Sequence, residues 1–299
     1  MRANYHFYPS CPLILLITYK DIHWMYRIIP FFALLICIAG CNQSQAPNQT
    51  KPPENQSKVI ENQTKSSENQ KTKVESSRYT TEYIRGLFDP ATHEDFVMID
   101  SIYADRAGLF LRKDTYAAFL QMRTAAKAKG INLVIRSATR NFDYQKGIWE
   151  RKWSGKTKIE NGKDASTAYP DPTDRALAIL RYSSMPGTSR HHWGTDIDLN
   201  SFDNEWFAEG EGLKLYNWLV EFGPAFGFCQ PYTPKGDARP HGYEEEKWHW
   251  SYTPVSSQLT TLAKSALKNE MISGFEGSGT AVGIDVVTKY VLGVDSSCK

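Results

Sequence analysis

The chain has 299 residues, of which 41% are hydrophobic and 23% are charged, and its formal net charge is +2. A net charge this small, without a basic stripe, argues against a nucleic-acid partner. Once the N-terminal region discussed below is set aside, about 220 residues remain, enough for one domain with a sizeable core. We expect this domain to occupy residues 78–299 and to be monomeric.

The N-terminus is predicted to be an export signal. An apolar run, Ile28–Gly40, follows Arg27. It is too short for a comfortable membrane span of about 20 residues, but typical of the core of a signal peptide. The run ends in Ile-Ala-Gly-Cys, which resembles the lipobox of bacterial lipoproteins, in which the cysteine is lipidated. Residues 1–41 are therefore expected to be a signal peptide, with Cys41 as the lipidation site.

The position of this apolar core indicates where translation begins. Signals of this kind start close to their core, so Met25 is a more natural start than Met1. The alternative, a first hydrophobic segment at 13–19, is short and has no cleavage signal. We expect a membrane-anchored lipoprotein of the bacterial cell envelope that faces the periplasm or the exterior.

Residues 42–77 are predicted to be a disordered tether. They consist of Asn, Gln, Ser, Thr, Lys and Glu with almost no apolar residues, and Glu-Asn-Gln recurs at 54, 61 and 68. This spacing suggests a coiled coil, but there is no apolar seam, and so disorder is favoured. Such a linker spans roughly 30 to 35 Å on average and up to about 120 Å when stretched, which would let an anchored domain reach well away from the membrane surface.

The remaining sequence predicts an α+β domain, with a small, mostly antiparallel sheet that is flanked by helices and carries the candidate functional residues described below. A helix is expected to be capped by Asp114, to run to Lys129 and to stop at Gly130. Periodicity predicts further helices at 173–182 and 213–222, and strands at 131–135 and 195–199. The tail beyond Gly274 is expected to dock on the domain through the stretch 284–292.

Two cysteines remain in the domain. Cys11 and Cys37 precede Cys41, so Cys229 and Cys298 are the only pair left in an oxidising compartment. They either form a disulfide that fastens the tail to the core, or Cys229 is a buried thiol.

The most informative pattern is a set of metal-binding residue types in two short segments. His191 and Asp198 lie in the first, and Glu246 and His249 in the second. A hydrolytic zinc centre usually takes three protein ligands and leaves a fourth position to water. Two imidazoles and one carboxylate supply these ligands for one Zn²⁺ per chain, and Glu246 then remains as the base. The alternative interpretation, ordinary half-buried histidines, is far less favoured for all four residues together than for either histidine alone.

Asp196 lies two residues before the candidate ligand Asp198. The run 195–200 alternates polar with apolar residues as a strand does, so both carboxylates should point to the same side. One of them can face the metal. The other is expected to orient the site from outside the ligand set, or simply to be solvated.

Together these segments resemble the zinc D-alanyl-D-alanine carboxypeptidases and vancomycin-resistance dipeptidases, which are related to lysostaphin and to the hedgehog signalling domain. The pattern of this group is Ser-x-His-x-x-Gly-x-Ala-x-Asp, followed downstream by Glu-x-x-His. The matching residues are Ser189, His191, Gly194, Asp198, Glu246 and His249. The chain departs from the pattern at Asp196, where the family has a small residue.

A third match lies upstream, in the segment 137–145, which looks like Ser-Gly-Tyr-Arg-Ser-x-x-x-Gln. The resemblance implies that Arg140 and Gln145 bind substrate, and it extends that role to Ser189. A planar guanidinium can hold a terminal carboxylate with two parallel hydrogen bonds, which suits a carboxypeptidase. Arg136 is a nearby rival, and only the resemblance selects Arg140 over it.

The function implied is a zinc peptidoglycan carboxypeptidase, which removes a terminal D-alanine from cell-wall stem peptides. In this mechanism Arg140 holds the terminal carboxylate, and Glu246 takes a proton from the metal-activated water and passes it to the leaving amine. Two alternatives stay open, an endopeptidase that uses the same zinc site and a non-catalytic cell-wall-binding lipoprotein. Charge reversal at Arg140 separates the first from the carboxypeptidase, because an endopeptidase needs no clamp for a chain end.

Overall fold

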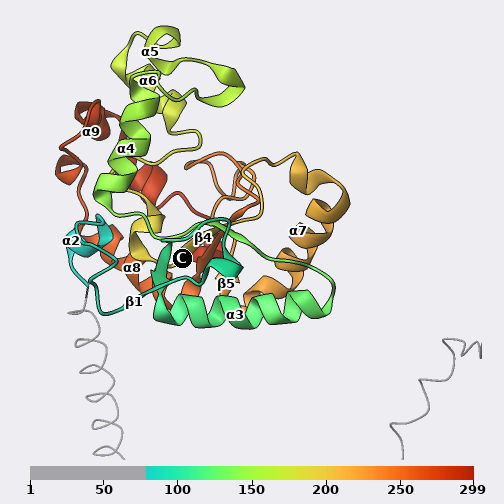
Figure 1. Cartoon of the computed structure of the whole chain (residues 1–299). Coiled ribbons are helices and arrows are strands. Elements are labelled where there is room, and N and C mark those ends of the chain that lie inside the picture. Colours follow the sequence, from blue (N-terminus) through green and yellow to red (C-terminus); the bar gives the residue numbers. More distant parts are fainter. Residues whose placement is uncertain (1–78) are drawn as a thin grey trace, which may run out of the picture. The chain divides into compact units, whose positions relative to one another are not determined.

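A four-stranded antiparallel sheet is the central element of residues 79–299, the part of the chain that this computed structural model describes (Figure 1). The strands follow the order β3 (Ile135–Ser137), β4 (Asp196–Leu199), β6 (His249–Tyr252), β5 (Phe228–Cys229). A separate antiparallel pair joins β1 (Phe96–Met98) to β2 (Phe110–Arg112). The predicted α+β class with a small antiparallel sheet is confirmed. The predicted signal peptide, Cys41 and the tether at 42–77 lie outside the described residues.

The two faces of the central sheet differ in chemistry because side chains alternate along a strand. In β4, Ile197 and Leu199 point into an apolar cluster, whereas Asp196 and Asp198 point to the other face. In β6, Trp250 joins the same apolar cluster. All four residues of β4 are buried, so the polar face is covered as well. The sheet therefore presents its carboxylates inside the protein.

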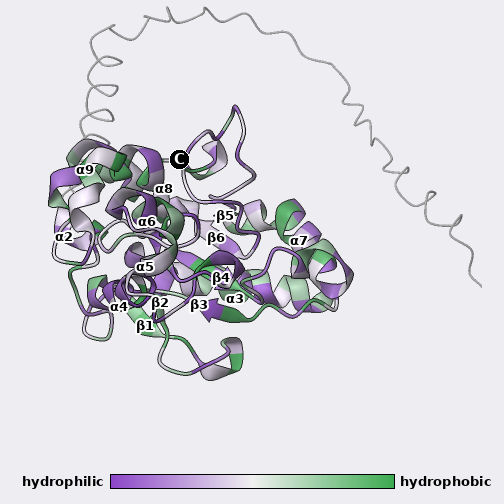
Figure 2. Cartoon of the chain, turned by 90° about the horizontal axis from the view of Figure 1, so that it is seen from above, coloured by the Kyte–Doolittle hydropathy of each residue, from purple (hydrophilic) through white to green (hydrophobic). Residues whose placement is uncertain are grey.

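Two long helices cover the apolar face. These are α3 (Lys113–Ala128) and α7 (Gly210–Phe222), which contribute Phe119 and Leu219, both fully buried, to the cluster. A second apolar cluster lies around the other helices and the C-terminal tail (Figures 1 and 2). These helices are α2 (Thr81–Ile84), α4 (Phe142–Trp153), α5 (Ala165–Ala168), α6 (Pro172–Ile179), α8 (Thr253–Ala266) and α9 (Ala281–Ile284). Sheet and helices thus enclose the polar face.

The predicted boundaries of several elements need correction. Asp114 does not cap α3 but lies in its first turn, where it pairs with Arg112 at 2.7 Å. The helix does stop before Gly130, whose φ is +71°. Of the strand predicted at 131–135, only Ile135 belongs to β3. The reason is that β4 ends at Leu199, and the next residue, Asn200, bonds to both backbone groups of Val134 instead of extending the ladder.

The other elements that were predicted lie close to their predicted positions, whereas α4, α8, β1, β2, β5 and β6 were not predicted. The helix predicted at 173–182 is α6, which ends at Ile179, and the one predicted at 213–222 is α7, which begins one turn earlier at Gly210. The strand predicted at 195–199 is β4, shorter by one residue. Among residues 79–299, no helix combines the length and apolar character needed to span a bilayer.

The C-terminal tail docks on the domain, as expected. Ile284, Val287 and Val291 are buried in the second apolar cluster. Cys229 of β5 and Cys298 form a disulfide, with 5.7 Å between their Cα atoms. The structure thus supports the disulfide rather than the buried thiol, and the end of the chain is fastened to the edge of the central sheet.

Candidate metal centre and active site

His191 lies in a short 3-10 turn, Arg190–Trp193, directly before β4. The turn ends at Gly194, whose φ is +72° and where a Cβ would come within 2.4 Å of the ring of Phe96, so glycine is required. The Nδ1 atom of His191 lies 2.8 Å from the carbonyl oxygen of Ala138. With Nδ1 donating to that carbonyl, Nε2 is left as an acceptor that faces Asp198 at 3.2 Å.

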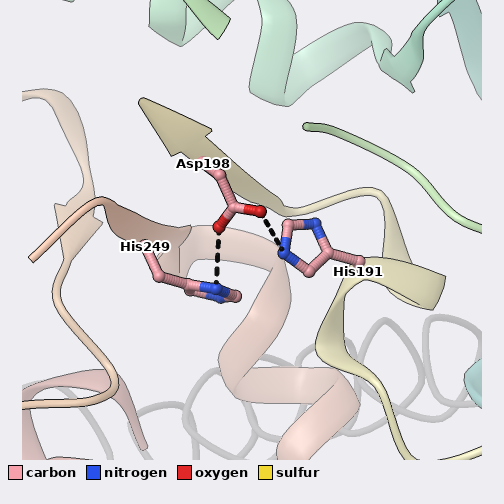
Figure 3. Close-up of side chains that lie close together, drawn as sticks. All are labelled: His191, Asp198 and His249. Carbon is pink, nitrogen blue, oxygen red and sulfur yellow. Dashed lines mark ion pairs between the residues drawn. The ribbon is translucent and has the colours of Figure 1, made fainter. Parts of the chain in front are cut away.

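Asp198 and His249 are brought together by the pairing of β4 with β6. They are direct partners in the register of the two strands. Asp198 Oδ1 lies 3.1 Å from His249 Nδ1, while its Oδ2 faces His191, as Figure 3 shows. Two motifs about fifty residues apart in the sequence therefore converge on one point, because cross-strand neighbours lie only about 5 Å apart.

These three side chains fit a metal ion. Their ligand atoms all lie within 4.8 Å of one another, and all three residues are buried. His191 Nε2 and Asp198 Oδ1 have no hydrogen-bond partner within the described structure, although buried polar atoms normally have one. Burial lowers the pKa of His191 and so favours the neutral imidazole that binds metals. Two imidazole nitrogens and a carboxylate are a donor set that suits Zn²⁺.

Asp196 lies on the opposite side of the His249 ring from Asp198. Its Oδ2 is 2.8 Å from His249 Nε2 and 3.0 Å from Nε of Arg190, and both Asp196 and Arg190 are fully buried. Burial alone would raise the pKa of Asp196, but the charges of Arg190 and His249 hold it well below its usual range. Asp196 is therefore an ionised carboxylate that orients His249, and it is not solvated. The arrangement matches the carboxylate–histidine pairs found behind many metal ligands.

Glu246 lies in the turn that leads into β6. Its backbone carbonyl accepts a hydrogen bond from the amide of His249, and its Oε2 lies 3.4 Å from His249 Nδ1. Burial raises the pKa of the Glu246 carboxyl group, although His249 opposes that shift. A raised pKa favours proton exchange near neutral pH, so the side chain is suited to acid–base chemistry.

The three predicted substrate-binding residues all line the same cavity, whose volume is about 710 Å³. Arg140 lies 3.5 Å from Asp198 Oδ2, and its Nε donates to Gln145 Oε1 at 3.0 Å. The amide nitrogen of Gln145 donates to the Ser184 carbonyl, so both polar ends of Gln145 are engaged. The Ser189 hydroxyl is buried and has no hydrogen-bond partner within the described structure.

The rival cation, Arg136, lies elsewhere. It pairs with Asp105 at 2.6 Å and donates to the Asn200 carbonyl, and it does not line the cavity. Arg239 is buried and donates to backbone carbonyls of its own loop. Neither arginine competes with Arg140 for a role in the cavity.

Several residues of the cavity wall carry no motif in the sequence. Tyr232 contacts the His249 ring, with 4.7 Å between ring centroids, and Lys152 of α4 joins Tyr182 and Trp248 on the wall. They come from separate loops and helices, and their spacing in the sequence follows no period. Only the fold brings them together.

Part of the chain matches a known protein family. The family model described as D-alanyl-D-alanine carboxypeptidase matches residues 108–255, which include every candidate site residue of the domain. A protein of that name from Enterococcus faecalis is 26% identical over 138 residues, and the match covers 44% of each chain. An uncharacterised protein from Haemophilus influenzae is 33% identical over 109 residues, which cover 30% of this chain and 80% of that protein.

Several solved structures also resemble the chain, and one of them is 22% identical to it. It is described as VanYB in complex with D-alanine-D-alanine, the match covers 59% of this chain and 87% of that one, and the TM-score is 0.42. The chain spans less than half the length of its relative from Enterococcus faecalis, but most of the length of the protein from Haemophilus influenzae. The family model covers about half of the chain and every candidate site residue of the domain, so the chain belongs to the D-alanyl-D-alanine carboxypeptidase family.

Proposed function

We propose that the protein is a zinc-dependent peptidase that removes a terminal D-alanine from the stem peptides of peptidoglycan. The observation that carries the proposal is the convergence of His191, Asp198, His249 and Glu246 on one cavity. Membership of a carboxypeptidase family supports the reaction class, and the name of the enterococcal relative supports a D-alanine substrate.

In this proposal the chain's own residues bind the peptide and move one proton. Arg140 holds the terminal carboxylate, and Gln145 keeps the guanidinium in place. The unpartnered hydroxyl of Ser189 is available to the substrate. Glu246 accepts a proton from the attacking water as the new C–O bond forms, and it donates this proton to the amine nitrogen as the C–N bond breaks.

His191, Asp198 and His249 would hold one Zn²⁺ per chain. When bound, the ion would supply Lewis-acid activation of water and of the peptide carbonyl. Asp196 orients the His249 ring and the Ala138 carbonyl orients the His191 ring, each through the ring nitrogen that would not bind the metal. The ligand atoms are therefore preorganised for the ion.

Replacing Glu246 with glutamine tests the acid–base role. Glu246→Gln keeps the shape of the side chain but removes its proton-accepting group, so turnover should fall at least about a hundredfold. Zinc content and thermal unfolding should stay as in the wild type, because Glu246 is not among the three ligands. Glu245→Gln is the matched control, since Glu245 does not line the cavity. Near wild-type turnover of Glu246→Gln would contradict the mechanism.

The substrate is tested with mass spectrometry of a muropeptide mixture that contains tri-, tetra-, penta- and cross-linked species. Loss of one D-alanine from the pentapeptide would establish D,D-carboxypeptidase activity, and shortening of the tetrapeptide would establish the L,D reaction. Loss of the cross-linked species alone would identify an endopeptidase. If nothing changed while zinc was bound stoichiometrically, the non-catalytic wall-binding function would replace the proposal.

A further inference from the structure

Lys152 lines the cavity two turns along α4 from Gln145. Gln145, Ile148 and Lys152 are spaced three and then four residues apart, so they lie on one face of the helix, and all three line the cavity. The two polar residues of this face also bond to two adjacent serines. Gln145 donates to the backbone carbonyl of Ser184, and Lys152 donates to the side-chain hydroxyl of Ser183. The cavity wall therefore carries a cation near each end of this helix face: Arg140, which is bonded to Gln145, and Lys152.

The charge of Lys152 is not paired directly with a carboxylate among the described residues. Its Nζ lies 2.5 Å from the Ser183 hydroxyl, which is neutral, and Lys152 makes no ion pair within residues 79–299. By contrast, Lys146 of the same helix pairs with Glu150, and Lys158 pairs with Asp164. An ammonium group has three donors, so the bond to Ser183 leaves two for another acceptor.

Burial makes this unbalanced charge costly. It lowers the pKa of Lys152, an effect that the charge of Glu246 opposes and that of Arg140 strengthens. Arg140 is partly balanced by Asp198, at 3.5 Å. An anionic group that entered the cavity would offset the free-energy cost of burying the Lys152 charge, and it would gain a charge-assisted hydrogen bond.

We propose that Lys152 binds a carboxylate of the peptide substrate, in addition to the contact made by Arg140. This inference rests on the proposed function, because it assumes that a peptide enters the cavity. Seven residues of helix separate Gln145 from Lys152, a rise of about 10 Å, which corresponds to about three residues of extended peptide. Since Arg140 holds the free end of the peptide, the carboxylate at this distance belongs to an acidic residue on the other side of the cleaved bond.

The test uses the zinc-loaded protein and synthetic peptides that end in D-Ala-D-Ala and carry one internal carboxylate, either free or converted to the amide. With Lys152→Met, we expect KM for the free-acid peptide to rise about ten- to hundredfold while kcat changes little. Arg151→Met is the matched control, because it removes the same charge from the adjacent, exposed residue, which does not line the cavity.

The amide peptide tests whether the internal carboxylate is the group that Lys152 binds. If Lys152 binds the internal carboxylate, the amide should weaken binding to the wild type but not to Lys152→Met. An equal loss on both peptides in Lys152→Met would show that Lys152 does not bind the internal carboxylate, and it would overturn the proposal. Unchanged KM for all peptides in Lys152→Met would overturn it.

Two further measurements separate substrate binding by Lys152 from a purely structural role. Ser183→Ala removes the partner of Lys152 without removing the charge, so an equal loss in that variant would show a structural role and overturn the proposal. Peptide binding to Glu246→Gln, measured by calorimetry with and without Lys152→Met, reports on Lys152 without turnover. A wild-type protein that binds these peptides through Lys152 but does not cleave them would refute the proposed function and leave this inference standing.

Discussion

Asp196 accepts hydrogen bonds from four side chains while fully buried, and one of the donors is Nε2 of the candidate ligand His249. In Asp196→Asn the side chain keeps its shape but loses its charge, and its amide group cannot accept all of these bonds. Zinc affinity should therefore fall about ten- to a hundredfold, the usual effect of losing a group behind a metal ligand. Competition with a chelator measures this change, and Asp237→Asn, at an exposed position, is the control.

The same substitution leaves Arg190 buried beside a neutral group, which should lower the free energy of unfolding by about 3 to 5 kcal/mol. The double variant Asp196→Asn/Arg190→Met should regain part of that stability without regaining zinc affinity. A double variant that regained both would show that Asp196 acts only by neutralising Arg190, and not by orienting His249.

At the level of residues, what could be foreseen depended on local spacing. The position of His191, Asp198, Glu246 and His249 in short motifs, together with strand alternation, was enough to predict their convergence. The choice of Arg140 over Arg136 required a family resemblance, because both follow the same short strand. Lys152 could not be foreseen, since its importance depends on which carboxylates are absent around it in space.

At the level of elements, helices were predicted better than strands. The apolar period that marks α3 and α7 is a property of the sequence itself, and Gly130 marks a helix end by its left-handed backbone. A strand instead depends on its partner. Ile131 and Leu133 are as apolar and buried as strand residues, yet Asn200 ends the pairing before it reaches them.

The disulfide between β5 and the tail gives a prediction for these elements. It closes a loop with a sequence separation of 69 residues, so losing it should lower the free energy of unfolding by about 2 to 5 kcal/mol. Urea unfolding of Cys229→Ala/Cys298→Ala measures the loss. A reductant should destabilise the wild type by a similar amount and leave the double variant unchanged. Equal sensitivity of both proteins to reductant would contradict the assignment.

At the level of the whole chain, we propose that the protein is a lipoprotein of the bacterial cell envelope, anchored through Cys41 and linked to its catalytic domain by residues 42–77. A disulfide in the domain agrees with a compartment outside the reducing cytoplasm. A substrate in the cell wall would then lie within reach of the tether, because an extended linker of this length spans up to about 120 Å.

Labelling with a fatty acid in a bacterial host tests the anchor on a chain that begins at Met25. The wild type should incorporate the label, and its mature N-terminus should be a modified Cys41, whereas Cys41→Ser should carry no label. Cys37→Ser is the matched control, because that cysteine lies four residues earlier, in the segment expected to be removed, and its loss should not reduce labelling. Both variants should keep the zinc content of the wild type, since the candidate ligands all lie beyond residue 190. Label in Cys41→Ser, or its loss in Cys37→Ser, would show that lipid is attached elsewhere and that Cys41 is not the anchor.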